Sequence, residues 1–254
     1  MTKLKSKIEI LDEKLPNFFY KYVWADNVIK ILETKRLWFS SPQDFNDPFD
    51  CNVNLIDFTP SNENIEKFIN EKVSKNRSVR RQEINKNKRD PYRIKNQMAK
   101  QTQDLFYKSG ICCFSEVNDN ILLWAHYADN HKGICLKFSS DLADIGTMTA
   151  KVNYKTGYET ANFWTEEGGA IYHLVFTKSD DWSYEKEIRV FRMISKGAID
   201  FDVSNLTQII FGCKADQSTI EKIKKIVLEN NYKHIKFGQA RQTKSSFKLF
   251  IDNK

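Results

Sequence analysis

Short strand-like segments separated by hairpin-scale gaps dominate the second half of the chain, and this pattern constrains the fold most. Alternating apolar and polar residues cover 110 to 115, 133 to 138, 149 to 154, 187 to 193, 198 to 201 and 206 to 212, followed by KHIKFGQA and SFKLFI. Such spacing, without regular alternation of strands and helices, is typical of antiparallel pairing. The sequence therefore predicts an α+β fold with a mainly antiparallel sheet.

Helical patterns surround these strands. A strand at 17 to 23, a helix at 26 to 36 and a strand at 37 to 42 predict a β-α-β opening; further helices are expected at 62 to 75, 90 to 108, 120 to 130 and 216 to 230. Repeats and linkers rich in Gly, Ser or Pro are absent. We therefore expect a single domain, 1 to 254, with a helical insertion at about 62 to 108.

Composition limits the cellular setting. The 254 residues are 41% hydrophobic, enough for a sizeable core. No apolar run reaches the roughly 18 residues of a membrane span, and the N-terminal sequence lacks signal-peptide features, so we expect a cytoplasmic protein that does not enter membranes. The five cysteines are widely spaced and odd in number, which indicates buried free thiols.

Positive charge is concentrated in one segment. Residues 72 to 100 contain eleven Lys or Arg against Glu83 and Asp90, a local charge of +9 within a chain of +7. We expect an exposed basic helical insertion that contacts a nucleic acid or an acidic partner. The alternative is a solvated surface without a partner.

The string LLWAHYADNHKGICLKF, residues 122 to 138, predicts a helix that turns into a strand. Trp124 belongs to its apolar stripe, and Gly133 is expected to end the helix with a positive φ. His126 and Tyr127 are candidate site residues because several groups that exchange protons or stack gather at this junction. A well-packed helix end is the alternative.

A second string, WSYEKEIRV, contains paired acids. In a strand over 182 to 190, Glu185, Glu187 and Arg189 share one face. Neighbouring carboxylates repel, so partial burial would raise the pKa of at least one of them. One acid would then orient a hydroxyl and the other would hold developing positive charge. An ordinary exposed strand face explains the pattern equally well.

The loop FNDPFD is a candidate binding loop. Phe45 and Phe49 would anchor it, leaving Asn46, Asp47 and Asp50 directed outward. Its alternative is simple turn formation, since Asn and Asp commonly bond their own backbone.

Other familiar sites are weakly supported. Cys112, Cys113, His126, His131 and Cys135 lie within reach of one junction, but CxxC spacing is missing, so no metal site is expected. GxGxxG and GxxxxGK[ST] loops are also absent. A Cys or Ser nucleophile paired with His126 stays open, although no GxSxG elbow occurs.

The segments FYKYV, LWFSSPQDFNDPFD, ICCFSEVNDNILLWAHYADNHKGICLKF, VNY and WSYEKEIRVF, in this order, resemble the bacterial family called domain of unknown function 2971 over nearly the whole chain. The family's name carries no reaction.

The string EKEIRVFRMISKGAIDFD also resembles the last motif of ADP-ribosyltransferases. This resemblance implies a split, mainly antiparallel sheet and the use of NAD. Glu187 would match the catalytic glutamate, which holds the ribose hydroxyl of NAD while nicotinamide departs. Glu185 would help to activate the acceptor. Ser115 would match the serine of the second strand.

The cofactor-binding residues implied by this resemblance come from several segments. Tyr20, Tyr22 and Trp124 are available to stack on a nicotinamide ring. The first strand departs from the family because FYKYV has no Arg or His. NAD would instead be anchored by Lys21, Tyr22 or a loop, and we take that loop to include Asn46 and Asp47, with Tyr127 lining the pocket.

The leading hypothesis is an intracellular ADP-ribosyltransferase or NAD glycohydrolase with Glu187, Glu185 and His126 as catalytic residues. It would modify nucleic acid or protein, in keeping with a toxin or defence role. The alternative is a noncatalytic module that senses a ligand or binds nucleic acid or protein.

Overall fold

The computed structural model describes residues 14–72, 76–165 and 168–253. The N-terminal stretch expected to lack a signal peptide lies mostly outside them, as does Lys75 of the basic segment. Among the described residues, no helix combines the length and apolarity needed to cross a bilayer.

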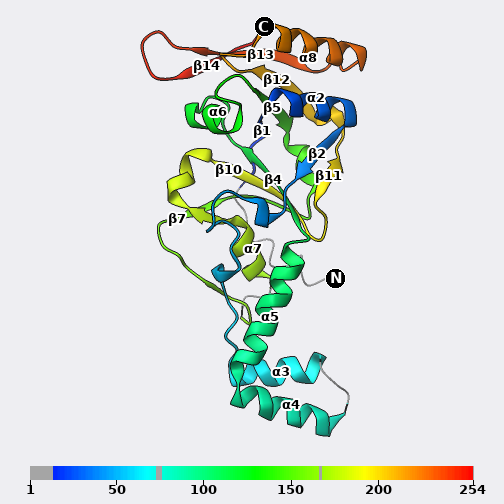
Figure 1. Ribbon diagram of the computed structural model, residues 1–254, viewed down its shortest axis with the longest axis vertical. Coiled ribbons are helices and arrows are strands. Elements are labelled where there is room, and N and C mark those ends of the chain that lie inside the picture. Colours follow the sequence, from blue (N-terminus) through cyan, green and yellow to red (C-terminus); the bar gives the residue numbers. More distant parts are fainter. Residues whose placement is uncertain (1–13, 73–75, 166–167, 254) are drawn as a thin grey trace.

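The centre of the molecule is an eight-stranded sheet (Figure 1). In spatial order the strands are β14 (Leu249–Asn253), β13 (Lys236–Gln242), β12 (Leu206–Phe211), β5 (Ile134–Ser139), β1 (Phe18–Val23), β4 (Gly110–Ser115), β10 (Glu187–Arg192) and β6 (Met148–Lys151). Among the described strands of this sheet, β12 and β13 are the only parallel neighbours. The predicted α+β fold with a mainly antiparallel sheet is therefore confirmed.

Three strand pairs lie outside this sheet. They are β2 (Arg36–Phe39) with β11 (Gly197–Asp200), β3 (Ile56–Asp57) with β8 (Ala161–Asn162), and β7 (Asn153–Lys155) with β9 (Thr177–Ser179). The predicted opening is correct in its order, β1, α2 (Ala25–Thr34) and β2. However, β2 joins β11 instead of the sheet that contains β1.

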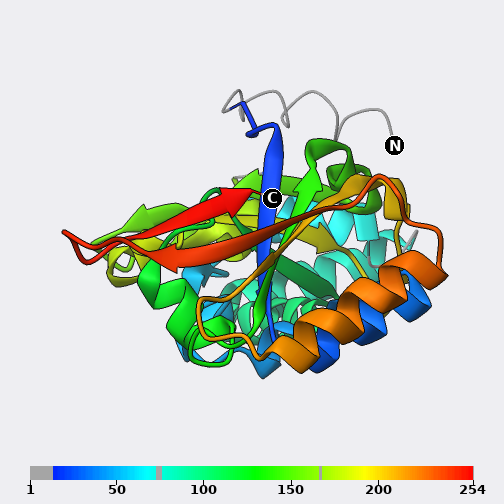
Figure 2. The same ribbon diagram turned by 90° about the horizontal axis from the view of Figure 1, so that it is seen from above.

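One face of the sheet is covered by α2 and α8 (Gln217–Glu229), which lie side by side (Figure 2). Both helices are amphipathic, and their apolar stripes, including Leu32 and Ile223, are fully buried. They pack with Leu136 and Phe138 of β5 in the largest apolar cluster. Burial of this stripe is what holds the helices to the sheet.

The opposite face is covered in two halves. The short helix α6 (Ile121–Tyr127) packs with β5, β12, β13 and β14. The helix α7 (Gly169–Phe176), which the sequence did not predict, packs beside β10 and β4.

The sheet is weakest between β1 and β4. Their register contains one paired position, Tyr20 opposite Ser115, whereas β1 and β5 pair along six positions. The split expected from the sequence is therefore present only as this thin junction within a continuous sheet.

A helical arm extends from the sheet at the end of the long axis opposite α8 (Figure 1). It consists of α3 (Asn62–Lys72), α4 (Arg77–Arg89) and α5 (Pro91–Phe106), and we call it the basic arm. Ile65 and Ile69 of α3 and Ile94 and Met98 of α5 are buried in one apolar cluster. The expected helices at 62 to 75 and 90 to 108 are thus joined by a further helix, α4.

Candidate functional site

A cavity of about 280 Å³ opens beside the junction of β1 and β4. Eight predicted site residues line it: Tyr20, Lys21, Tyr22, Asn46, Ser115, Tyr127, Glu185 and Glu187. These residues come from separate stretches of the sequence, and the fold brings them to one place. Their roles in binding or catalysis stay predictions.

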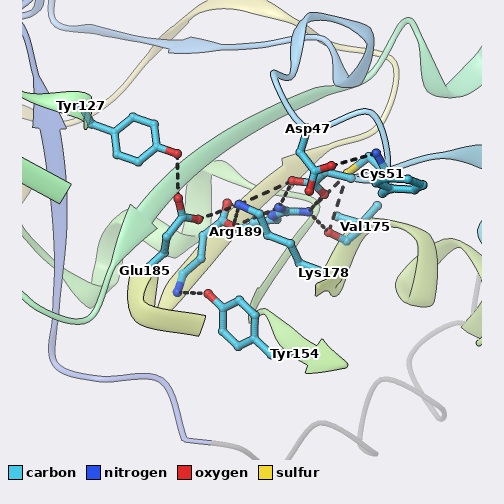
Figure 3. Close-up of polar contacts among 11 residues, drawn as sticks. Asp47, Cys51, Tyr127, Tyr154, Val175, Lys178, Glu185 and Arg189 are labelled. Carbon is cyan, nitrogen blue, oxygen red and sulfur yellow. Dashed lines mark hydrogen bonds and ion pairs between the residues drawn. The ribbon is translucent and has the colours of Figure 1, made fainter. Parts of the chain in front are cut away.

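Arg189 is the fully buried member of a charge cluster (Figure 3) whose other members, Asp50, Lys178, Glu185 and Glu187, line this cavity. Its two terminal nitrogens donate to the two carboxylate oxygens of Asp50 at 2.8 and 2.6 Å. Nε and Nη2 donate to the two oxygens of Glu187, each at 2.9 Å. Nη1 also donates to the carbonyl of Val175 at 2.6 Å. The guanidinium, which is fully buried, is therefore bidentate to both acids.

Lys178 is the second cation of the cluster. Its Nζ lies 2.6 Å from Glu185 Oε2, 3.2 Å from Glu187 Oε2 and 3.7 Å from Asp50 Oδ2. The ammonium also lies over the ring of Trp182, 4.9 Å from its centroid. Lys178 thus joins all three carboxylates, and Glu187 is held by both cations.

These contacts determine how the cluster ionises. Burial opposes ionisation of Glu187, but Arg189 and Lys178 outweigh it and lower the pKa of Glu187 to about 2. Burial likewise opposes the charge of Lys178, while Glu187 and Asp50 raise its pKa above the ordinary value. The sequence predicted a raised pKa for at least one of the paired acids. For Glu187 this is wrong in direction, because the prediction considered only the repulsion between the acids and not their pairing with Arg189 and Lys178.

Glu185 reaches the cluster from a different element than predicted. It is the last residue of the 3₁₀ helix η4 (Asp180–Glu185), and Lys186 follows with φ of 43° before β10 begins. Glu185 is therefore not on a strand with Glu187. Its carboxylate nevertheless points at Lys178, and Tyr127 Oη donates to its other oxygen at 2.6 Å (Figure 3).

The helix that carries Tyr127 is aligned by its N-cap. The Asn120 side chain accepts from the backbone N–H of Leu122 at 2.9 Å, which caps α6. The Asn120 amide also donates to the carbonyl of Tyr184 at 2.9 Å, which ties α6 to η4. One residue thereby places the Tyr127 hydroxyl opposite Glu185.

Ser115 contacts both segments that carry the paired acids. It is opposite Glu187 in the register of β4 and β10, and opposite Tyr20 in the register of β1 and β4. Its hydroxyl donates to the backbone carbonyl of Glu185 at 2.6 Å. The serine therefore holds the end of η4 against the end of β4.

The side chains of β1 contact the neighbouring segments. Lys21 donates from Nζ to the carbonyl of Cys113 at 3.0 Å and so bridges the junction of β1 and β4. Tyr22 donates from its hydroxyl to the carbonyl of Val117 at 2.9 Å. Both residues also line the cavity.

Two predicted residues of α6 lie outside this cavity. Trp124 is fully buried, its Nε1 donates to the carbonyl of Asn118 at 2.8 Å, and its ring contacts Tyr22 edge to face. It therefore belongs to the core and cannot stack on a ligand. His126 is exposed and does not line the cavity, whereas Leu123 and Tyr127 of the same helix do.

The FNDPFD loop is only partly as predicted. Asp47 is buried and accepts from the backbone N–H of Phe49 at 2.9 Å, so it forms the turn and does not face the cavity. Phe49 is 63% exposed and does not anchor the loop. Phe45 does, since it packs in the core and lies 5.6 Å from the guanidinium carbon of Arg189.

Sequence reasoning did not assign Lys178 and Arg189 to the site, and its expectation that Asp50 points outward is wrong, since Asp50 is buried and bonded to Arg189. Arg189 alternates with Glu187 along one strand face, and this signal was available. Lys178 follows α7, a helix the sequence did not predict, and no motif marks it. The pairing of Arg189 with Asp50 of the FNDPFD loop joins residues that are 139 positions apart, and a local sequence pattern does not reveal such a contact.

The side chains that could bind a metal ion are those of His, Cys, Asp and Glu, and a Cys could also act as a thiol nucleophile. The parts of the chain that the structure describes contain no group of three or more His, Cys, Asp or Glu arranged to hold a metal ion. The five cysteines are free. Burial raises the pKa of Cys51 and Cys113, so both are held as thiols next to the charge cluster.

The comparison with protein families finds one match. The family described as protein of unknown function (DUF2971) matches residues 123–190, which include Tyr127, Lys178, Glu185 and Glu187. This confirms the resemblance to domain of unknown function 2971 over that part of the chain. No curated protein and no solved structure matches the chain.

Proposed function

We propose that this chain, with its DUF2971 match over residues 123–190, is an ADP-ribosyltransferase-like enzyme that uses NAD. The substrate class is a dinucleotide with a cationic aromatic ring, and the acceptor is a hydroxyl of a nucleic acid, a protein or water. With water as acceptor the activity is that of an NAD glycohydrolase. The proposal places the enzyme in the cytoplasm, in keeping with its free thiols.

The observation that carries this proposal is the adjacency of three strands. Ser115 on β4 and Glu187 on β10, which match motif positions of the family, are paired on neighbouring strands, and Tyr20 on β1, the candidate for stacking on nicotinamide, lies opposite Ser115. All three line the same cavity. Nothing in the linear order of these segments requires that arrangement.

The electrostatics support Glu187 as the group that stabilises positive charge. Its carboxylate remains ionised at neutral pH because Arg189 and Lys178 lower its pKa. The same contacts hold it in one orientation, so little reorganisation is needed when charge develops nearby. With three acids and two bases, the cluster has a formal charge of −1 if all five groups are ionised, which favours a cationic ligand.

Glu185 is suited to accept the acceptor's proton. One of its oxygens bonds to Lys178 and the other to Tyr127, and its carboxyl group lines the cavity. Tyr127 is held as a neutral donor, because burial and its bond to Glu185 raise its pKa. In the proposed reaction Tyr127 orients Glu185, and Glu185 receives the proton of the attacking hydroxyl.

The cavity suits part of NAD. When bound, NAD supplies the bond between nicotinamide and ribose that breaks, and nicotinamide leaves with the bonding electrons. The rings of Tyr20, Tyr22, Phe45, Phe114 and Tyr127 form walls suitable for a cationic ring. The volume of about 280 Å³ is just below the range of about 300–1,000 Å³ usual for ligand pockets. It suits the nicotinamide riboside half, with the remainder outside.

Nicotinamide release from NAD tests the proposal. We expect release by the wild type, with nucleic acid and cell extract offered as acceptors. In Glu187→Gln, which keeps the shape and removes the charge, the rate should fall by at least about 100-fold, since preorganised charge contributes on this scale. The matched control is Glu33→Gln, an exposed acid on α2, which should release nicotinamide at the wild-type rate.

Glu187→Gln also leaves Arg189 with fewer partners, so folding must be checked separately. Each variant is compared by circular dichroism and thermal unfolding before its rate is interpreted. A folded Glu187→Gln that matches the wild type in rate would refute the catalytic role. Zero release by every variant would refute the enzymatic proposal.

One observation favours a second candidate, a noncatalytic ligand-binding module. The oxygens of Glu185 and Glu187 already bond to Lys178, Arg189 and Tyr127. A saturated cluster of this kind also serves simply to shape a pocket. This candidate predicts that NAD or another aromatic cation binds without any release of nicotinamide.

We further propose that the basic arm binds nucleic acid or an acidic partner. Arg77, Arg81, Lys86 and Arg89 are all exposed along α4. Lys88 is partly neutralised by its ion pair with Glu66. The arm projects from the sheet (Figure 1), so its charge is accessible to a large acceptor.

A further inference from the structure

A second cavity, of about 580 Å³, lies between the loop of the β13–β14 hairpin and the turn that follows α6. We call it the hairpin cavity. Its lining includes Ile121 at the start of α6, whereas Leu123 and Tyr127 of the same helix line the first cavity. The function proposed above makes no use of the hairpin cavity.

Positive charge surrounds the hairpin cavity. Lys214, Lys244 and Lys248 are exposed at its rim, and no acidic residue lines it. Within the described residues, no carboxylate forms an ion pair with any of these three lysines. Uncompensated like charges at one concave site repel each other, and a bound anion would relieve that repulsion.

His131 adds a buried polar atom without a partner. Its ring lines the hairpin cavity, and its Nδ1 is buried and has no hydrogen-bond partner among the described residues. Buried polar atoms are rarely left unpaired, because the lost hydrogen bond is costly. The backbone of His131 is fixed, since its carbonyl accepts from the N–H of Lys214 at 3.0 Å.

The hairpin loop supplies hydroxyl groups and an aromatic ring. Thr243, Ser245 and Ser246 line the cavity, and the Thr243 hydroxyl donates to the carbonyl of Ser246 at 2.6 Å, which closes the loop. Phe247 is 99% exposed at the tip. Lysines and hydroxyls with a nearby exposed ring match the chemistry of a phosphate group attached to an aromatic base.

We propose that the hairpin cavity binds the phosphate groups of a nucleotide. Lys214, Lys244 and Lys248 neutralise the phosphate oxygens, the hydroxyls of Ser245 and Ser246 donate to them, and His131 lies against the bound group as part of the cavity wall. Phe247 offers a stacking surface to the base. This site is separate from the cavity at the junction of β1 and β4, and it does not depend on NAD cleavage.

Calorimetric titration with pyrophosphate and with ADP tests this site. We expect both to bind the wild type. In the triple variant Lys214→Gln, Lys244→Gln, Lys248→Gln, affinity should fall at least about tenfold, since even one bond to a charged group contributes that much. The matched control is Lys30→Gln, Lys222→Gln, Lys233→Gln, which removes three exposed lysines that do not line the cavity.

The two ligands distinguish the source of the phosphate. Tighter binding of ADP than of pyrophosphate, lost in Phe247→Ala, supports a nucleotide. Equal binding of the two would overturn the stacking role and leave phosphate recognition alone. The histidine ring resonances provide a second readout. The chain has four histidines, and only the signal missing from a His131→Gln variant should shift when pyrophosphate is added.

Two results would refute the phosphate site. No binding of either ligand at about 1 mM, which corresponds to about −4 kcal/mol, would refute the site. Equal losses in the triple variant and its control would show unspecific attraction to a basic protein and would also refute it. These outcomes are independent of nicotinamide release.

Discussion

Arg189 has no contact with water, so its charge depends entirely on its neighbours. Asp50 and Glu187 each bond to two of its nitrogens, and the carbonyl of Val175 takes a further bond. A buried charge is tolerated only with this degree of pairing, and removal of one partner typically costs about 3–5 kcal/mol. The residue therefore links the FNDPFD loop to β10 through its paired charges.

The depressed pKa of Glu187 makes stability depend on pH. A carboxylate whose pKa is lower in the folded state stabilises the fold above its unfolded pKa, and this contribution is lost as the pH falls through the folded value. For Glu187 the window extends from 4.5 down to about 2. The contribution above this window is about 3 kcal/mol.

Urea unfolding of the wild type and Glu187→Gln at several pH values measures this contribution. We expect the wild type to be more stable above pH 4.5, and the difference between the two proteins to shrink as the pH falls towards 2. Glu33→Gln should show no such trend. A constant difference between the wild type and Glu187→Gln across this range would contradict the ionised state assigned to Glu187.

At the scale of elements, the turn between α6 and β5 is the most constrained connection. Asp129, Asn130 and His131 have consecutive positive φ values of 43°, 52° and 72°. Asp, Asn and His adopt this region more readily than other side chains. The prediction that Gly133 would take the positive φ is therefore wrong. Gly133 is needed for space, since a Cβ there would lie 2.5 Å from the carbonyl oxygen of Val23.

Gly212, just after β12, packs against the backbone of this turn. A Cβ at Gly212 would lie 2.1 Å from the carbonyl oxygen of His131, and backbone cannot move away as a flexible side chain does. We expect Gly212→Ala to lower the free energy of unfolding by about 2 kcal/mol or more, as overpacking does. Gly157→Ala is the control, because no atom lies within 4 Å of its added Cβ.

Urea unfolding measures both glycine variants. The arrangement of the turn would be refuted if Gly212→Ala were as stable as Gly157→Ala. The same variant should also weaken pyrophosphate binding, because His131 belongs to both the turn and the hairpin cavity.

At the scale of the whole molecule, charge is separated along the long axis. The basic arm lies at one end, and residues 72 to 100, with a local charge of +9, lie almost entirely within it. The rest of the chain has a charge of about −2. Such a molecule would approach a polyanion with the arm first.

Salt dependence of nucleic-acid binding tests the arm. In Arg77→Gln, Arg81→Gln, Lys86→Gln, Arg89→Gln, affinity for duplex DNA should fall, and each lost phosphate contact should flatten the slope of log K against log salt by about 0.9. The control is the quadruple variant Lys30→Gln, Lys35→Gln, Lys222→Gln, Lys233→Gln, exposed lysines outside the arm. An unchanged slope in the arm variant would remove nucleic acid from the partners.

Local chemistry was sufficient to predict most elements of the fold. β4 has the predicted bounds, and β1, β12 and α8 begin or end within one residue of them, because apolar alternation and helical periodicity are properties of neighbouring residues. The helix α7 was missed, because it is short and apolar on most sides and so lacks a periodic pattern.

The sequence by itself determined the α+β class, most of the order of strands and helices, and a set of candidate site residues, eight of which line one cavity. Only the tertiary structure decided how those residues are charged and paired. Lys178 reaches Glu187 because η4 turns the chain back between β9 and β10, and Asp50 reaches Arg189 from another part of the chain. Electrostatic interaction depends on distance in space, which a linear pattern does not contain.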